Sequence, residues 1–486
     1  MSSKNFINYS YYNEILISLF IIKMKGGNVI GEGAYGCVFD PALLCEGEKE
    51  RPNGFITKML DIRNFNQEWK AIQEADEVIK LIPNNENYFI VNQVKPCINP
   101  TYDDSIDLSN FSDKTCNALT KKKFPSIPGE VVPVSTQINR LKAATKSNIF
   151  QGLSMPNGGP DVNKYTKPEK FSPEHLISLN NTLIDLIING VIPMNNGGLL
   201  HLDAKAANIV YDGRFARLID WGLAAKVNPR TISGIDKDIS PTIMVNRPFT
   251  NILFIQKGSN LVLVDYINHH ILPSLSGATK DEMAIDFKKK LRSGLLQSVD
   301  VMRIDLNSKI NGHLSYIADV AYGGNVDEVL NVIAIQIAYA VLEQCLSDDL
   351  RMIDYFNLAK YVEDVYRHNV DVYGVITCYL TLITNSHKDI VRTTKIASAL
   401  DTNVITKYLY SDKCAATAYN INELIADLQS LNSNSVLYPN STKDLPPEIA
   451  VPPAPQNTPA AGGKRRKSKK SKTNKKNKTR KRKSRK

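Results

Sequence analysis

Residues 201–210 read HLDAKAANIV, and residues 218–222 read LIDWG. The first segment has the form H-x-D-x-K-x-x-N, and Asp220 follows Asn208 by twelve residues. Short apolar runs of the strand type border both segments, so two acids, a lysine and an amide are expected on neighbouring turns. Phosphoryl transfer needs such a set: a carboxylate that orients a hydroxyl, oxygen ligands for Mg²⁺ and a cation. The alternative is that Asp203 and Asn208 only form the turns.

A glycine-rich stretch, IGEGAYGCV at residues 30–38, lies near the start of the chain. Strand-type residues follow its last glycine, whereas a dinucleotide-binding fingerprint would open a helix. A hairpin of this kind can face backbone N–H groups toward phosphates, because glycine lets the backbone approach closely. A plain hairpin turn is the alternative. The candidate nucleotide-binding residues here are Ile30, Gly31, Gly33, Gly36 and Val38.

Lys58 lies within the strand-type run FITKML at residues 55–60. A buried lysine is costly unless an opposite charge matches it, so we expect it to meet a phosphate or a carboxylate. Glu68 and Glu74, both on a predicted helix over residues 65–82, are the candidate partners, and Glu68 is slightly favoured. The alternative is a solvated lysine on the surface.

Taken together, these motifs resemble those of the protein kinase family, most closely the divergent Ser/Thr kinases encoded by large nucleocytoplasmic DNA viruses. The resemblance rests on the glycine loop, Lys58, the two segments quoted first, and NVDVYG at residues 369–374, in the family's order. It covers residues 26 to about 385. It implies an α+β, bilobal fold with a small β-rich N-lobe, a larger helical C-lobe carrying an insertion, and ATP and Mg²⁺ as substrate and cofactor.

The resemblance also implies roles for individual residues. Asp203 would be the catalytic base, with Lys205 on the γ-phosphate, and Lys205 favours Ser/Thr acceptors in proteins. Lys58 would contact the α- and β-phosphates, and Asn208 and Asp220 would bind Mg²⁺. An interlobe hinge is implied over residues 150–161, where the backbone near Ser154 and Met155 would contact the adenine. His201 and Asp371 would support the catalytic loop. A simple helix N-cap is the alternative for Asp371.

Three departures from the family pattern stand out. Leu202 replaces an arginine that in many kinases pairs with a phosphorylated activation loop, so we expect activity without such phosphorylation. Trp221 replaces the usual phenylalanine and keeps a large apolar ring. The interval from Asp220 to Asp371 is unusually long. We interpret residues from about 250 to 367 as an inserted subdomain, with a strand over 261–264 and helices over 281–296 and 327–346. Just before it, residues 246–249 are expected to form an anchoring turn.

The charge is unevenly distributed along the chain. Sixteen of the 60 basic residues lie between Lys464 and Lys486, so residues 1–463 carry 44 basic against 49 acidic groups. The expected organisation is an N-terminal extension (1–23), an N-lobe (24–157), a C-lobe (158–438), a Pro-rich linker (439–463) and a disordered basic tail (464–486). Such a tail suits nucleic acid or another polyanion, nuclear targeting, or solubility alone.

Seven scattered cysteines without a Cys-x-x-Cys pair argue against a disulfide framework and for a reducing compartment. The viral resemblance implies an intracellular location in the host cytoplasm or nucleus, with packaging in a virion as a further expectation. No apolar run reaches the ~20 residues of a membrane span. Residues 15–22 could instead be the core of a secretion signal, or Met24 the true start. Two rival functions stay open: a kinase-like phosphotransferase acting on lipids or small molecules, and a non-catalytic scaffold of the same fold with a nucleic-acid-binding tail.

Overall fold

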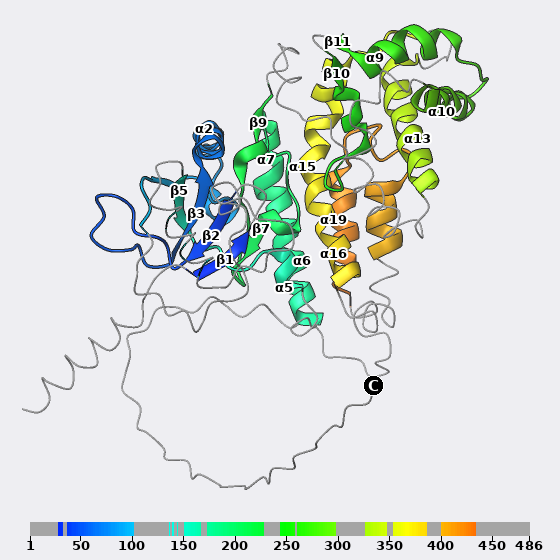
Figure 1. Cartoon of the computed structure of the whole chain (residues 1–486). Coiled ribbons are helices and arrows are strands. Elements are labelled where there is room, and N and C mark those ends of the chain that lie inside the picture. The colour runs from blue at the N-terminus through cyan, green and yellow to red at the C-terminus, as the bar shows by residue number, and fades with distance from the viewer. Residues whose placement is uncertain are drawn as a thin grey trace, which may run out of the picture. The chain divides into compact units, whose positions relative to one another are not determined.

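The computed structural model describes nine stretches of the chain and three isolated positions between residues 136 and 143 (Figure 1). The stretches are residues 28–32, 36–101, 150–166, 173–227, 244–257, 260–297, 326–347, 353–385 and 400–433. The predicted N-terminal extension, Gly33, the Pro-rich linker and the basic tail lie outside the described residues.

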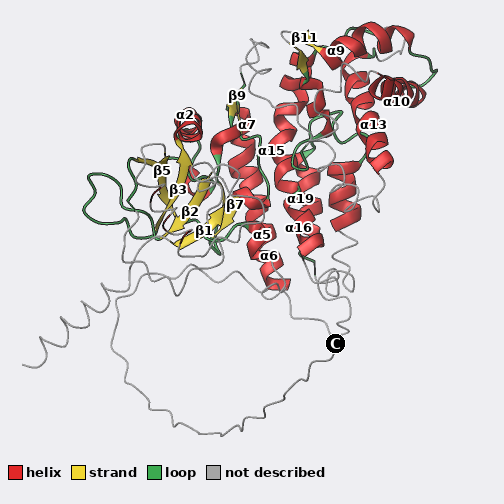
Figure 2. Ribbon diagram, in the orientation of Figure 1, coloured by secondary structure: helices red, strands yellow, loops and turns green. Residues whose placement is uncertain are grey.

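A five-stranded antiparallel sheet forms the first part of the fold (Figure 2). Its spatial order is β1 (Asn28–Glu32), β2 (Gly36–Asp40), β3 (Phe55–Asp61), β5 (Phe150–Pro156) and β4 (Lys95–Cys97). The predicted hairpin across the glycine loop is confirmed, because β1 pairs with β2 in antiparallel fashion. The predicted strand around Lys58 is confirmed as β3.

The helix α2 (Ile62–Ile79) follows β3 directly and confirms the predicted helix, shifted by three residues. Asp61 caps its start by accepting a hydrogen bond from the backbone N–H of Asn64. The buried apolar residues recur at helical spacing, so one stripe of α2 packs on the sheet and contacts β5. They are Phe65, Ala71, Ile72, Ala75 and Ile79.

Two small two-stranded sheets carry the segments quoted at the outset. β6 (Leu199–Leu200) pairs with β9 (Ala225–Lys226), and β7 (Ile209–Tyr211) pairs with β8 (Ala216–Leu218). The polar residues of both motifs therefore lie on turns next to short strands, as predicted. Four helical elements precede these two sheets in the chain: α5 (Val162–Tyr165), α6 (Pro173–Asp185), a π-helical segment (Leu186–Val191) and α7 (Ile192–Asn196).

A central helix, α15 (Arg367–Ile376), lies against α7, and residues 369–376 are all buried. It continues a helical stretch formed by α14 (Leu358–Tyr361) and a π-helical turn (Val362–Tyr366). Asp371 is therefore inside a helix, and its alternative as an N-cap is wrong. Around α15 lie α16 (Cys378–Asn385), a π-helix (Leu400–Tyr410) and α19 (Ile421–Ser430).

The predicted insertion is largely helical where it is described. α10 (Lys280–Gln297) and α13 (Val326–Cys345) confirm the two predicted helices and pack on each other. The predicted strand over 261–264 is wrong beyond its first residue: β11 ends at Leu261, and α9 (Val262–Tyr266) begins at the next residue. Leu263 and Val264 are buried and pack as helix residues, which an apolar run of four cannot distinguish from a strand.

Two described helical stretches are long and apolar enough to cross a membrane, Glu174–Asn196 and Asp327–Cys345. Half and two thirds, respectively, of their apolar windows are buried within the protein. Core helices of ordinary domains have the same composition, so neither is a clear membrane span.

The expectation of no disulfide is wrong for the sheet. Cys45 and Cys97 form a disulfide, with their Cα atoms 5.0 Å apart, and Cys37 is also disulfide-bonded. Strand pairing brings β4 to this place across 52 residues of sequence, a proximity that cysteine spacing does not reveal. Cys345, Cys378 and Cys414 are free and buried.

Candidate active site

The loop between β6 and β7 gathers polar groups around Asp203. Lys205 Nζ donates to both carboxylate oxygens of Asp203, at 2.9 and 2.8 Å. Asn208 Nδ2 donates to the main-chain oxygen and to Oδ2 of the same residue, at 3.0 and 2.8 Å. Asp203 is only 7% exposed, so these donors hold its carboxylate in one orientation. The predicted grouping of Asp203, Lys205 and Asn208 is what the structure contains.

Asp371 supports this loop from α15. Its two carboxylate oxygens accept the backbone N–H groups of His201 and Leu202, at 2.7 and 2.8 Å. Leu202 has φ of 60°, a left-handed conformation that costs a residue with a Cβ atom free energy. The buried carboxylate of Asp371 thus stabilises a strained turn, and burial raises the pKa of Asp371 in spite of His201 and the two backbone donors.

Gly374 explains how α15 comes so close to the loop. A Cβ atom at this position would lie 2.4 Å from the carbonyl oxygen of Ala204, too near for any side chain. Glycine is required here by close approach, one turn along the helix from Asp371.

His201 is fully buried and bonded through both ring nitrogens. Nε2 lies 3.0 Å from the carbonyl oxygen of Ile219, and Nδ1 accepts the backbone N–H of Asp203 at 3.3 Å. A carbonyl can only accept, so Nε2 carries the proton and the ring is neutral. Burial lowers the pKa of His201, and the nearby carboxylates do not offset it.

A second group of charges links β3 and α2 to the turn after β8. Lys58 Nζ lies 2.7 Å from both oxygens of Glu68 and 2.9 Å from Oδ1 of Asp220. The Lys58 side chain is 18% exposed, so the alternative of a surface lysine is wrong. Glu68 is its partner on α2, whereas Glu74 pairs with Lys70 at the surface.

Burial and the attraction between charges affect the pKa values of Lys58, Glu68 and Asp220 differently. Burial works to lower the pKa of Lys58, but the Glu68 and Asp220 carboxylates outweigh it and raise that pKa. For Glu68, burial outweighs the attraction of Lys58 and the pKa is raised. For Asp220, burial is outweighed by Lys58, and the pKa is lowered. The ammonium and the Asp220 carboxylate are therefore the two charges that the surroundings stabilise best.

Asn208 and Asp220 offer oxygen atoms that fit a hard divalent cation. Asn208 uses its NH₂ group on Asp203, which leaves its carbonyl oxygen without a hydrogen bond among the described residues. Asp220 has φ of 69°, and its side chain is 41% exposed. Oxygen ligands of this kind, completed by water and phosphate, suit Mg²⁺. Among the described residues, no group of three or more His, Cys, Asp or Glu side chains is arranged so that it could hold a metal ion by itself.

The strand register places the predicted nucleotide-binding residues. Gly31 pairs with Val38, Val38 with Lys58, and Lys58 with Leu153, so these residues form one row across the sheet. Cross-strand partners share a face, which puts Val38 and Leu153 on the face of Lys58. Leu153 was not predicted; alternation along β5 from Met155, two residues later, would have indicated it.

The remaining residues predicted to bind the nucleotide lie in the sheet or in the loop between β1 and β2. A Cβ atom on Gly36 would lie 2.1 Å from the carbonyl oxygen of Met59, so packing against β3 already requires this glycine. Ser154 and Met155 lie inside β5, and the connection to α5 begins only after Pro156. The predicted hinge over 150–161 is thus a strand for most of its length. Ile30 lies on β1, and Gly33 is outside the described residues.

From the sequence, residues 246–249 are expected only to form an anchoring turn, yet two of them reach the loop that follows β6. Asn246 Nδ2 donates to Oδ1 of Asp203 and to the carbonyl oxygen of Ala204, each at 3.1 Å. Arg247 Nε donates to the carbonyl oxygen of Leu202 at 2.6 Å. Local sequence patterns could not have predicted either contact, because more than 40 residues separate the partners.

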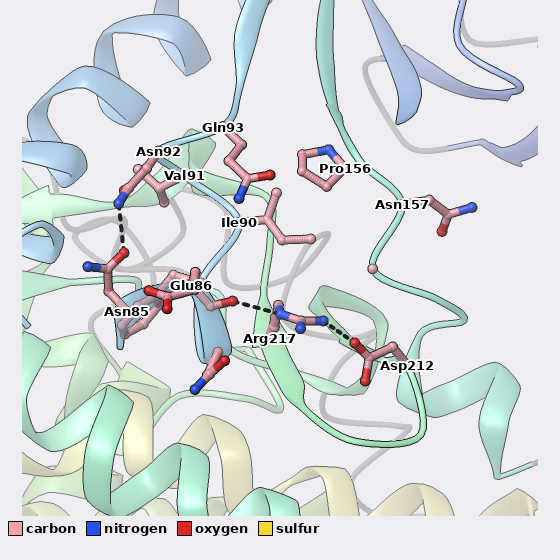
Figure 3. A pocket seen from close by; sticks show the side chains of 13 residues that line it. Asn85, Glu86, Ile90, Val91, Asn92, Gln93, Pro156, Asn157, Asp212 and Arg217 are labelled. Carbon is pink, nitrogen blue, oxygen red and sulfur yellow. Dashed lines mark hydrogen bonds and ion pairs between the residues drawn. The ribbon is translucent and has the colours of Figure 1, made fainter. Parts of the chain in front are cut away.

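A cavity of about 500 Å³ opens elsewhere, beside the segment between α2 and β4 (Figure 3). Two of its charged groups pair with each other, since Arg217 donates to Asp212 at 2.6 Å, and Arg217 also donates to the main-chain carbonyl oxygen of Glu86 at 2.8 Å. None of the predicted catalytic or metal-binding residues lines it. The charged groups around Asp203 and Lys58 are therefore the better candidate for the active site.

Comparison with known proteins returns no family model and no curated protein that matches the sequence. The functional assignment consequently depends on this geometry and on the motif resemblance.

Proposed function

We propose that this protein is an ATP- and Mg²⁺-dependent protein kinase with the bilobal fold of that family, acting on serine or threonine hydroxyls. The observation that carries the proposal is the meeting of Lys58, Glu68 and Asp220, which brings a lysine of the sheet within 2.9 Å of an acid 162 residues away. Phosphoryl transfer depends chiefly on positioning and on charge stabilisation, and this arrangement supplies both.

The sheet and its glycine hairpin would receive the nucleotide. Val38, which is half-buried, offers apolar surface on the face where Lys58 offers its charge, and Leu153 packs in the core on the same face. Ile30, Gly31, Gly33 and Gly36 belong to the loop that would cover the phosphates. The backbone near Ser154 and Met155 would meet the adenine, although Pro156 beside them has no N–H to donate.

The loop after β6 would perform the transfer. Asp203, held by its three donors, is oriented to accept the proton of a substrate hydroxyl, and Lys205 is placed to neutralise charge on the transferred group. Asn208 and Asp220 would hold Mg²⁺, which when bound offsets the negative charge of the phosphates. Lys205 is 37% exposed and so can leave Asp203 for a phosphate when one binds.

The deciding experiment is transfer of the labelled γ-phosphate of ATP, with Mg²⁺, to a panel of acidic and basic proteins by the wild type and by Asp203→Ala. Incorporation on serine or threonine that vanishes in Asp203→Ala is the expected result. ATP binding without protein phosphorylation would favour the rival readings, a lipid or small-molecule phosphotransferase or a scaffold, and lipid and small-molecule acceptors tested in parallel separate these two.

The basic tail supports a second proposal, binding of nucleic acid or another polyanion. Residues 464–486 contain sixteen Lys or Arg and no acid, and lie outside the described residues. Counterion release predicts affinity for DNA that falls steeply with salt. Comparing the full chain with a chain ending at residue 463 tests this, and equal affinities with flat salt dependence would remove nucleic acid from consideration.

A further inference from the structure

The segment just before the helical turn Phe249–Phe254 is almost completely buried against the catalytic loop. Asn246 is 5% exposed and Arg247 1% exposed, although both carry strongly polar side chains. Burying an amide and a guanidinium is costly unless each finds partners. Both side chains donate hydrogen bonds to three consecutive residues of the loop, Leu202, Asp203 and Ala204.

We propose that Asn246 and Arg247 are positioning residues that hold the catalytic loop and its carboxylate in working geometry without a phosphorylated activation loop. The inference rests on the proposed kinase function and deepens it, since it states how the active site is regulated. It also gives the departure at Leu202 a physical basis.

The peptide groups around Leu202 are clamped from two sides. Asp371 accepts the N–H of Leu202, and Arg247 donates to its carbonyl oxygen. The left-handed φ of Leu202 needs such support, because nothing in its own apolar side chain compensates the strain. Burial raises the pKa of Asp371, and the positive charge of Arg247 is one of the groups that act in the other direction. Arg247 thus supplies, from inside the fold, a cation beside a loop whose own position 202 lacks one.

Asn246 acts on the carboxylate itself. Oδ1 of Asp203 accepts hydrogen bonds from Asn246 and Lys205, whereas Oδ2 accepts from Lys205 and Asn208. When Lys205 turns to a phosphate, Asn246 becomes the remaining donor to Oδ1 among the described residues. Its second hydrogen bond, to the carbonyl of Ala204, ties the same amide to the loop backbone. Loss of the amide would leave one oxygen of the base unrestrained.

A matched pair of substitutions tests this assignment. Asn246→Thr and Asn246→Val have nearly the same size and differ in one hydroxyl donor. The Val variant is expected to lose roughly 10- to 100-fold in kcat, the effect of one hydrogen bond to a charged group, with KM for ATP within about twofold of the wild type. The Thr variant is expected to recover most of that loss. Equal losses in both variants, or none in either, would overturn the role of Asn246.

A separate measurement tests whether the active geometry is independent of activation-loop phosphorylation. Wild type treated with phosphatase, and shown by mass spectrometry to carry no phosphate, is expected to keep its transfer rate, and loss of activity would overturn the inference. Arg247→Lys is expected to retain more kcat than Arg247→Met, with thermal unfolding followed in both. Equal activity of these two variants would likewise count against Arg247. Absence of transfer by untreated wild type would instead overturn the proposed function, and this inference with it.

Discussion

Replacing Glu68 by glutamine tests the charge group that links α2 to the turn after β8. The substitution keeps the size of the side chain and removes its charge. Lys58 now divides its hydrogen bonds between Glu68, at 2.7 Å, and Asp220, at 2.9 Å. With Glu68 neutral, Asp220 is the remaining anionic partner of Lys58 in the described part of the chain. The ammonium is then expected to shift onto the carboxylate proposed to bind Mg²⁺.

The size of the effect follows from the balance of burial and attraction. A hydrogen bond to a charged group contributes about 1.5–3 kcal/mol, which corresponds to roughly 10- to 150-fold in kcat/KM. Stability should change less, because burial already raises the pKa of Glu68 and so disfavours its charge. We therefore expect kcat/KM to fall within that range, while the free energy of unfolding falls by less than the roughly 3–5 kcal/mol that an unpaired buried charge costs, because Asp220 still pairs with Lys58.

Steady-state phosphoryl transfer over a range of Mg²⁺ concentrations, together with urea unfolding, measures both quantities. Half-saturating Mg²⁺ is expected to rise in Glu68→Gln. Glu74→Gln is the matched control, since it changes the same group on the same helix at a side chain that is 42% exposed. Identical kinetics in the two variants would refute the reasoning, and so would a large loss of stability with unchanged catalysis.

Three further predictions concern the framework. His201 is neutral in the folded protein and its pKa is lowered, so its full contribution to the free energy of unfolding is present above the unfolded pKa of about 6.5 and is lost as the pH falls below that value. Between pH 7.0 and 5.5 the free energy of unfolding should fall by up to about 1.2 kcal/mol through this residue, and urea unfolding of His201→Tyr should lack this contribution. Gly374→Ala forces a contact with Ala204 and should cost about 1–3 kcal/mol in unfolding free energy while lowering kcat; wild-type rates with wild-type stability would contradict the packing. Cys45→Ser opens the 52-residue loop to Cys97 and should cost roughly 4 kcal/mol under oxidising conditions, measured against wild type with and without reductant, and equal stability of the two proteins without reductant would count against the disulfide.

Much of the site was predictable because its residues are local. Asp203, Lys205 and Asn208 lie within six positions, and a turn of that length between two short strands brings their side chains together. The strand around Lys58 and the helix carrying Glu68 were likewise predictable from period-two and helical patterns.

Other contacts could not be predicted from local patterns. Glu68 and Glu74 lie about 120° apart around one helix, since six residues turn it by about 600°. Only the docking of α2 on the sheet decides which of them meets Lys58. The apolar run over 261–264 was ambiguous for a different reason, because four apolar residues fit a buried strand and a buried helix equally well.

The sequence by itself determined the α+β class, the elements that carry the polar motifs, and the chemical identity of the groups available for catalysis, because these depend on residue types and short spacings. Tertiary structure alone decided that Asp220 meets Lys58, that Cys45 meets Cys97, and that Asn246 reaches Asp203. Each of these contacts joins residues more than 40 positions apart. Their proximity depends on how whole elements pack, and periodicity within a single element carries no record of its distant neighbours.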